Sequence, residues 1–238
     1  MDSALLIDII RGYCRENANE ANVVRYSRYF KGEYNAHGLT QPQINFKARE
    51  LAKTTGMTLQ VVLDAAPLLM ESKKYEETGL FLLMLKHLHK QFTHETFNAI
   101  NTFYAQGIHN WAHADTLGML VLPLFVNKGL VELSDFKPWI RSPHKFQRRS
   151  VPVTLIKSLK TAPDYNRFFL FLESLMQDPE REVHQGMGWF LREAWKRKPL
   201  ETEAFLLKWK DRAPRLIIQY ATEKMIPEEK LRFRREKR

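Results

Sequence analysis

HNWAHADTLGMLVLPLF, residues 109–125, joins a polar start to an apolar run. Trp111 and Asp115 are four positions apart, so a helix would carry both side chains on one face. The apolar run that follows, from Leu117 to Phe125, is hydrophobic enough that we expect it in a core. This order of a polar start and an apolar continuation recurs along the chain and indicates the fold class.

Comparable helical patterns begin near residues 76, 113, 148 and 183, and a further one near 212 fits the same series. A spacing of about 30–38 residues allows one helix pair per repeat, as in an α-solenoid. Few segments alternate as half-buried strands do. We therefore predict an all-α fold, an α-solenoid of antiparallel helix pairs in a single domain over residues 1–238. The polar starts of the inner helices are expected to project into one concave, basic groove.

The charge balance favours a polyanionic partner. The 238 residues carry a formal net charge of +10, and such a surplus attracts phosphate groups and releases their counterions. Nucleic acid is the first choice of partner, and the alternative is a set of Lys and Arg residues that only solvate the surface. The basic tail, about residues 228–238, has the composition of a solvated or frayed terminus.

Other classes of protein are disfavoured by composition. No stretch approaches the ~20 apolar residues of a membrane span, and the N-terminus lacks the basic start of a secretory signal. Cys14 is the only cysteine, which excludes an intramolecular disulfide and a multi-cysteine zinc site. His109 and His113 have the spacing of a helical metal pair, but no third ligand accompanies them, so we predict no metal and no cofactor. We predict a monomer in the cytoplasm, associated with the nucleoid when it acts.

Trp111 and Asp115 have two interpretations. Asp115 could cap a helix that begins at Thr116 while Trp111 anchors the core, because Asp is a favoured N-cap residue. Alternatively, both side chains line the groove, since the small residues Ala112 and Ala114 keep the area around the carboxylate open.

Two later helix starts offer further candidates. In FQRRSVPV (146–153), Arg148 and Arg149 place two cations near a helix N-terminus, where they oppose the helix dipole. That choice favours an external anion such as phosphate. In EVHQGMGWFLREAW (182–195), Trp189 follows two glycines, and a glycine inside a helix costs about 1 kcal/mol relative to Ala. Either a ligand approaches the backbone there or a neighbouring helix packs closely.

Four segments together resemble the DNA alkylation repair glycosylases of the AlkD type, which are built from HEAT-like helical repeats. NWAHAD is similar to the family's W-x-x-x-D, FQRRSVPV to W-L-x-R-x-A-I, and VHQGMGWFLREAWKRKP to V-x-K-A-I-G-W-x-L-R-E-x-x-K-x-x-P. RYFKGEYNAHGLTQP (28–42) is similar to R-Y-M-K-x-x-F-x-x-x-G-I-x-x-P. The four occur in the family's order and span roughly residues 20–200.

The resemblance implies hydrolysis of the N-glycosidic bond of cationic alkylated purines, such as N3- or N7-alkyl adducts, in double-stranded DNA. Asp115 would stabilise the oxocarbenium-like sugar and orient water, and Trp111 and Trp189 would offer π faces to the sugar and lesion. Arg149 would hold a phosphate beside the lesion. Further contacts to DNA are expected from Tyr29, Lys31, Arg148 and Arg192.

The chain also departs from the family's pattern. Phe146 stands where the family often has Trp, and Gln185 and Gly186 replace Lys-Ala. Asn110 and Ala112 occupy positions that are often Trp and Asp. Some relatives bind DNA without excising bases, so the alternative is a non-catalytic HEAT-like module that binds a DNA structure or a protein partner. The intact set of Trp111, Asp115, Arg149 and Trp189 favours the enzyme.

Overall fold

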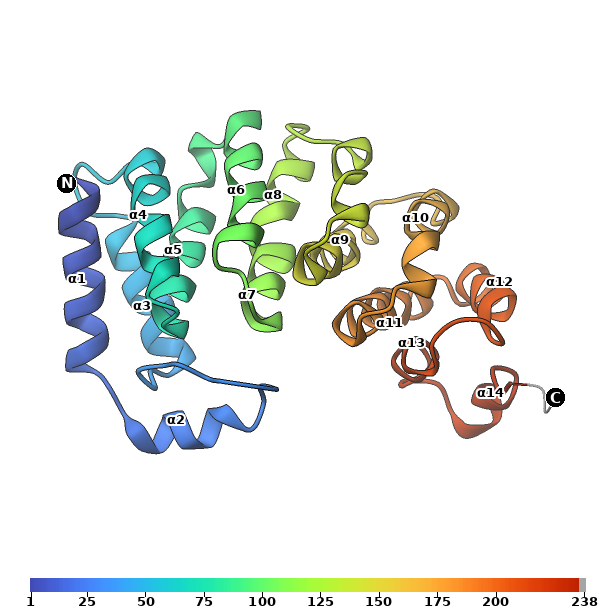
Figure 1. The fold of residues 1–238 in the computed structure, drawn as a ribbon. Coiled ribbons are helices and arrows are strands. Elements are labelled where there is room, and N and C mark those ends of the chain that lie inside the picture. Colours follow the sequence, from blue (N-terminus) through green and yellow to red (C-terminus); the bar gives the residue numbers. More distant parts are fainter. Residues whose placement is uncertain (236–238) are drawn as a thin grey trace. The chain divides into compact units, whose positions relative to one another are not determined.

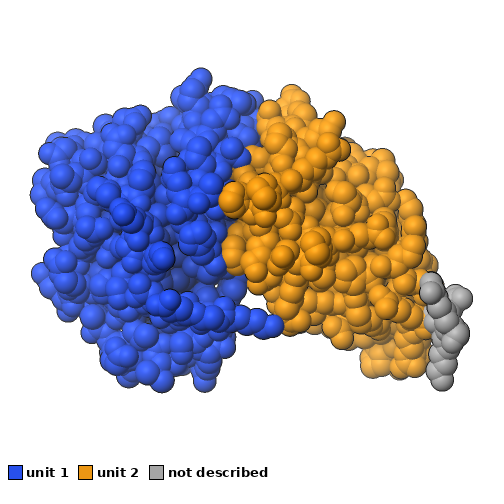
Figure 2. Space-filling view, viewed as in Figure 1, with its two compact units in different colours: residues 1–131 blue, residues 132–238 orange. Residues whose placement is uncertain are grey.

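A computed structural model describes residues 1–235, and these residues form helices and connecting turns without a β-strand (Figure 1). The all-α prediction is therefore confirmed. The chain divides into two compact units, Met1–Val131 and Glu132–Arg238 (Figure 2). Each unit has its own buried core. The single-domain interpretation and the concave groove both stay predictions.

The first unit contains eight α-helices, a 3₁₀ turn and a π-helical turn among its described residues. They are α1 (Ser3–Glu16), α2 (Glu20–Ser27), α3 (Gln41–Leu51), α4 (Leu59–Glu71), α5 (Tyr75–His87), η1 (His89–Gln91), α6 (His94–Gln106), α7 (Trp111–Thr116), the π turn η2 (Leu117–Val121) and α8 (Leu122–Asn127). The central helix is α5, which packs against α1, α3, α4, α7 and η2. Every residue from Glu76 to Leu85 is buried, as expected of a helix that is apolar nearly all round.

The second unit contains six α-helices and three 3₁₀ turns in its described part. They are η3 (Leu133–Phe136), η4 (Trp139–Arg141), α9 (Lys145–Ser158), α10 (Asn166–Leu172), η5 (Glu173–Gln177), α11 (Arg181–Trp195), α12 (Pro199–Trp209), α13 (Arg215–Ala221) and α14 (Pro227–Leu231). Here α11 is central and packs between α9 and α13.

The repeat spacing expected from the sequence is present. The five inner helices α5, α7, α9, α11 and α13 begin at residues 75, 111, 145, 181 and 215, so successive starts are 34–36 residues apart. Each lies within three residues of its predicted position. Further helices such as α6 and α12 alternate with them along the chain, which agrees with the predicted helix pairs.

The two glycines of α11 serve helix packing. A Cβ on Gly186 would lie 3.1 Å from Cγ and 3.2 Å from the backbone oxygen of Arg149 on α9. A Cβ on Gly188 would lie 2.4 Å from Cβ of Tyr220 and 2.9 Å from the backbone oxygen of Ile217 on α13. Of the two interpretations of these glycines, close packing of helices is therefore correct. Gly186 allows α9 to approach α11, and Gly188 allows α13 to approach it from its own side.

The described part of the basic tail is anchored at one buried side chain. Phe233 is 1% exposed, the backbone oxygen of Phe233 accepts a hydrogen bond from Arg215, and Arg235 donates to the backbone oxygen of Ala213. Most residues of 228–235 are exposed, as expected of a solvated tail, but the buried Phe233 and two hydrogen bonds anchor this segment to α13 and the turn before it. Residues 236–238 lie outside the described part. No helix within residues 1–235 has the length and apolar character needed to cross a membrane.

Candidate nucleic-acid interface

The start of α7 decides between the two interpretations of Trp111 and Asp115. The helix begins at Trp111, and the side chain of Asn110 caps it by accepting a hydrogen bond of 2.9 Å from the backbone N–H of His113. Asp115 is therefore the fifth residue of the helix and not its cap. Trp111 is 38% exposed, so it is not a core anchor either. The structure thus excludes the cap role for Asp115 and full burial for Trp111.

Two residues after Asp115, at Leu117, the helix widens into the π turn η2. Pro123 gives the physical reason, because proline has no N–H to donate to the carbonyl four residues earlier, at Met119. The widened turn shifts the hydrogen-bonding register ahead of the proline while the chain stays helical. π-Helical turns inside α-helices occur frequently at functional sites. Asp115 thus sits in the last regular turn before a backbone irregularity.

Trp111 is held by the loop that follows α2. Its indole Nε1 donates a hydrogen bond of 3.3 Å to the backbone oxygen of Tyr29, and its ring stacks on Phe30 with centroids 5.5 Å apart. Phe30 in turn stacks on Tyr34 at 4.6 Å and meets the edge of Tyr75 at 5.6 Å. This aromatic cluster fixes the ring while leaving part of it exposed. Sequence reasoning missed Phe30, Tyr34 and Tyr75, although the aromatic density of RYFKGEY was a visible signal.

His113 joins α7 to this cluster from beneath. It is 4% exposed, and its ring stacks on Tyr75 with centroids 4.8 Å apart. Nε2 donates to the backbone oxygen of Tyr75 and Nδ1 accepts from the side-chain amide of Asn110, both at 2.9 Å. Burial lowers the pKa of His113 to about 4, so the ring is neutral at pH 7. Both ring nitrogens of His113 are used in hydrogen bonds within the protein.

Tyr29 and Lys31 lie at the exposed edge of the same loop. Tyr29 is 59% exposed, and the guanidinium of Arg28 lies 5.1 Å from its ring centroid. Lys31 is exposed beside it in sequence. An aromatic cavity of about 230 Å³ opens between this loop and α7. It is lined by Tyr26, Tyr29, Phe30, Tyr34, Leu39, Gln41, Ile44, Tyr75 and Trp111.

In the second unit, Arg149 occupies the corresponding place on α9. It is the fifth residue of its helix, as Asp115 is of α7. Its side chain is 5% exposed, and Nη1 donates a hydrogen bond of 2.7 Å to the backbone oxygen of Glu182 at the start of α11. Gly186 leaves room for the Arg149 side chain against α11. The guanidinium is therefore fixed in direction by two helices.

Arg148 points to a different partner. Its Nε and Nη2 bind the two carboxylate oxygens of Asp178 at 2.6 and 3.1 Å, and its Nη1 donates to the backbone oxygen of Ser142 at 2.7 Å. The expectation that this cation calls for an external anion is wrong, because Asp178 already supplies the counter-charge. Its predicted contact with DNA stays untested.

Trp189 and Arg192 lie on α11, and Trp189 is half-buried. Arg192 forms ion pairs with Glu193, at 3.3 Å, and with Glu223. The structure thus brings Trp111, Asp115 and Tyr29 together in the first unit. It places Arg149 and Trp189 on neighbouring helices of the second. That these two sets meet in one site stays a prediction.

The comparisons with known proteins agree with this fold. The model of the DNA alkylation repair enzyme family matches residues 11–225, so the chain belongs to that family. Of the solved structures, a predicted DNA alkylation repair enzyme from Enterococcus faecalis has a TM-score of 0.75 at 15% identity, covering 89% of this chain and 98% of its own. AlkD2 from Streptococcus mutans has a TM-score of 0.59 at 16% identity, covering 87% and 99%. No curated protein matches the chain. Family membership supports a role in DNA repair, and at these identities the solved structures show the fold alone.

Proposed function

We propose that the protein is a monofunctional DNA glycosylase that releases cationic N3- or N7-alkylpurines from double-stranded DNA. One observation carries the proposal. In a member of a DNA alkylation repair family, α7 presents a partly exposed Trp111 on the same helical face as Asp115. Asp115 is not the cap of its helix, and Trp111 keeps part of its ring exposed. A carboxylate beside an exposed indole suits a sugar that becomes cationic on an anionic backbone.

The reaction follows from the charge of the substrate. As the bond between sugar C1′ and the purine nitrogen breaks, its electron pair goes to the purine and neutralises the alkylated base, so no proton has to be supplied. The sugar becomes an oxocarbenium ion, which the carboxylate of Asp115 stabilises. Water then forms a bond to C1′ and transfers a proton to Asp115. The π face of Trp111 favours the same cationic sugar.

The other candidate residues are proposed to have supporting roles. Arg149, whose direction is fixed by Glu182 and Gly186, is proposed to hold the phosphate beside the lesion, and Trp189 to contact the lesion. Tyr29 and Lys31 are exposed and are proposed to contact the DNA backbone directly. Arg148 and Arg192 would reach DNA only by exchanging the carboxylates that they now bind. We propose that the protein acts as a monomer, without a cofactor, in the cytoplasm on the nucleoid.

The test is release of N7-methylguanine or N3-methyladenine from methylated duplex DNA. Asp115→Asn keeps the shape of the side chain and removes its charge, so release should fall by on the order of 10²-fold or more. Asp8→Asn is the matched control, because Asp8 is exposed on α1, at the opposite edge of the first unit from α7 (Figure 1). If the wild type binds DNA but releases neither base, the protein is a non-catalytic binding module.

A further inference from the structure

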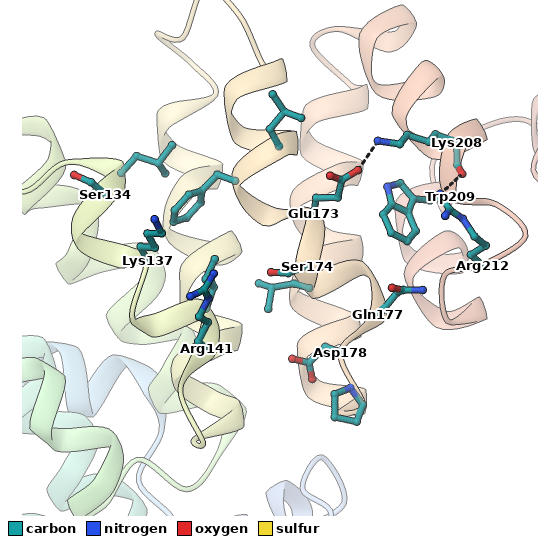
Figure 3. A pocket seen from close by; sticks show the side chains of 16 residues that line it. Ser134, Lys137, Arg141, Glu173, Ser174, Gln177, Asp178, Lys208, Trp209 and Arg212 are labelled. Carbon is teal, nitrogen blue, oxygen red and sulfur yellow. Dashed lines mark hydrogen bonds and ion pairs between the residues drawn. The ribbon is translucent and has the colours of Figure 1, made fainter.

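A groove of about 1030 Å³ opens on the second unit, and none of the residues proposed for the glycosylase site lines it. Its walls come from η3 and η4, from α10 and η5, and from the end of α12 (Figure 3). These are the segments that alternate with the inner helices, so the groove belongs to the other layer of the repeat. We call it the outer groove.

The outer groove carries an excess of positive charge. Of the acidic side chains that line it, Glu173 pairs with Lys208 and Asp178 pairs with Arg148. The lining residues Lys137 and Arg141 are exposed, and within residues 1–235 no carboxylate lies within ion-pairing distance of either. Arg212 adds a third cation at the rim. The groove is therefore complementary to an anionic ligand.

Trp209 supplies a second, independent observation. It lines the outer groove and is only 6% exposed, yet its indole Nε1 has no hydrogen-bond partner. No other buried side-chain nitrogen or oxygen in the described part of the chain lacks one. Figure 3 draws the indole among the lining side chains, with its nitrogen edge toward Glu173. A buried Trp N–H almost always finds an acceptor, so this unpaired donor favours a ligand that supplies one.

Apolar side chains line the remainder of the outer groove. Leu170 is 69% exposed, and the partly exposed Phe171 and Ile140 lie on the lining beside it. The guanidinium of Arg212 lies 4.6 Å from the Trp209 ring centroid, which keeps that cation at the edge of an apolar floor. Trp and Arg are the residues most enriched in the energetic centres of protein interfaces.

We propose that the outer groove binds an acidic peptide segment of a partner protein, one that also carries apolar side chains. The carboxylates would meet Lys137, Arg141 and Arg212, the apolar side chains would cover Leu170 and Phe171, and a carbonyl or carboxylate oxygen would accept from Trp209. A phosphodiester backbone satisfies the cations but has nothing to bury against Leu170. The apolar lining therefore favours a peptide over a nucleic acid. This inference does not depend on the glycosylase activity.

The probes are short fluorescein-labelled peptides composed of Asp, Glu, Leu, Phe and Ser, measured by fluorescence anisotropy with the full chain. Counterpart peptides carry Lys in place of the acids or Ala in place of Leu and Phe. The acidic, apolar peptides should bind, and both counterparts should bind at least ~10-fold more weakly. Lys137→Glu/Arg141→Glu should raise the dissociation constant at least ~10-fold. The control Lys157→Glu/Lys160→Glu makes the same change in charge at exposed positions outside the groove and should bind as the wild type does.

A second readout reports on Trp209 directly. Its indole N–H resonance, assigned by its loss in Trp209→Phe, should move downfield when peptide is added, as a new hydrogen bond forms. Trp209→Phe keeps an aromatic ring and removes the donor, so it should weaken peptide binding about tenfold or more.

The inference is overturned if the acidic, apolar peptides do not bind, or if they bind the groove variant and the wild type equally. It is also overturned if only single- or double-stranded DNA moves the Trp209 resonance, because the groove would then be a nucleic-acid surface.

Discussion

Replacing Arg148 with Met tests whether this arginine serves the fold or the DNA. The ion pair with Asp178 is bidentate, at 2.6 and 3.1 Å, and the two side chains are 11% and 4% exposed. Met fills a similar volume but leaves the buried carboxylate with the backbone N–H of Glu180, at 2.9 Å, as its remaining donor. Breaking one side of a buried ion pair costs about 3–5 kcal/mol. A native domain has only about 5–15 kcal/mol of stability, so the loss should be large.

The assay is urea unfolding at pH 7, followed by circular dichroism. Arg148→Met/Asp178→Asn should recover part of the loss, because the uncompensated charge has gone. The control is Arg181→Met, an exposed arginine at the start of α11, which should change stability by no more than ~0.5 kcal/mol. The reasoning is refuted if Arg148→Met is as stable as this control. It is also refuted if the variant instead weakens the dependence of DNA affinity on salt concentration by the amount expected for the loss of about one phosphate contact.

Two further predictions concern buried groups. Because burial lowers the pKa of His113 from 6.5 to about 4, only the unfolded chain binds a proton between these values, and stability present above pH 6.5 is lost as the pH falls toward 4. The wild type should lose about 3 kcal/mol of stability in this way, and His113→Gln, which has no group titrating there, should not. The difference in free energy of unfolding between the wild type and His113→Gln, measured in urea, should therefore be smaller at pH 4 than at pH 7 by about that amount. An equal difference at the two pH values would contradict this. Gly188→Ala should lower the free energy of unfolding by ~1–3 kcal/mol in spite of a helix-propensity gain of about 1 kcal/mol. Gly186→Ala, with contacts of 3.1–3.2 Å in place of 2.4–2.9 Å, should cost less, and equal losses would show that α11 tolerates a Cβ on both sides.

The helices of the repeat could be predicted from the sequence because their spacing is set by burial. The stretch EETGLFLLMLKHL is apolar on nearly all sides, and such a helix is stable only where other helices surround it. The sequence therefore predicted a buried helix here, and its predicted start is close to the observed start of α5. The sequence could not predict why α11 contains two glycines, because a glycine is suited equally to the close approach of a ligand and of a neighbouring helix. Only the distances to Arg149 and Tyr220 decide between them.

The partners of charged side chains could not be predicted, because they are distant in sequence. Arg148 and Asp178 are thirty positions apart, and nothing local in FQRRSVPV distinguishes the arginine that turns to a buried carboxylate from its neighbour Arg149. The members of the aromatic cluster are also distant in sequence, so their contacts could not be predicted either. Phe30 and Trp111 meet only because the loop after α2 folds back over the start of α7, which helical periodicity does not describe.

The cap of α7 shows how a local ambiguity bears on function. Asn110 and Asp115 are both good cap residues, and the sequence alone allows the helix to begin after either. The structure assigns the cap to Asn110, whose side chain binds both the backbone N–H and the ring of His113. Asp115 then lies within the helix, beyond the unpaired N–H groups of the first turn, and cannot be explained as a cap. The choice of cap therefore decides where Asp115 lies on α7, one turn after an indole that the aromatic cluster keeps partly exposed, and this placement is what the Asp115→Asn comparison tests.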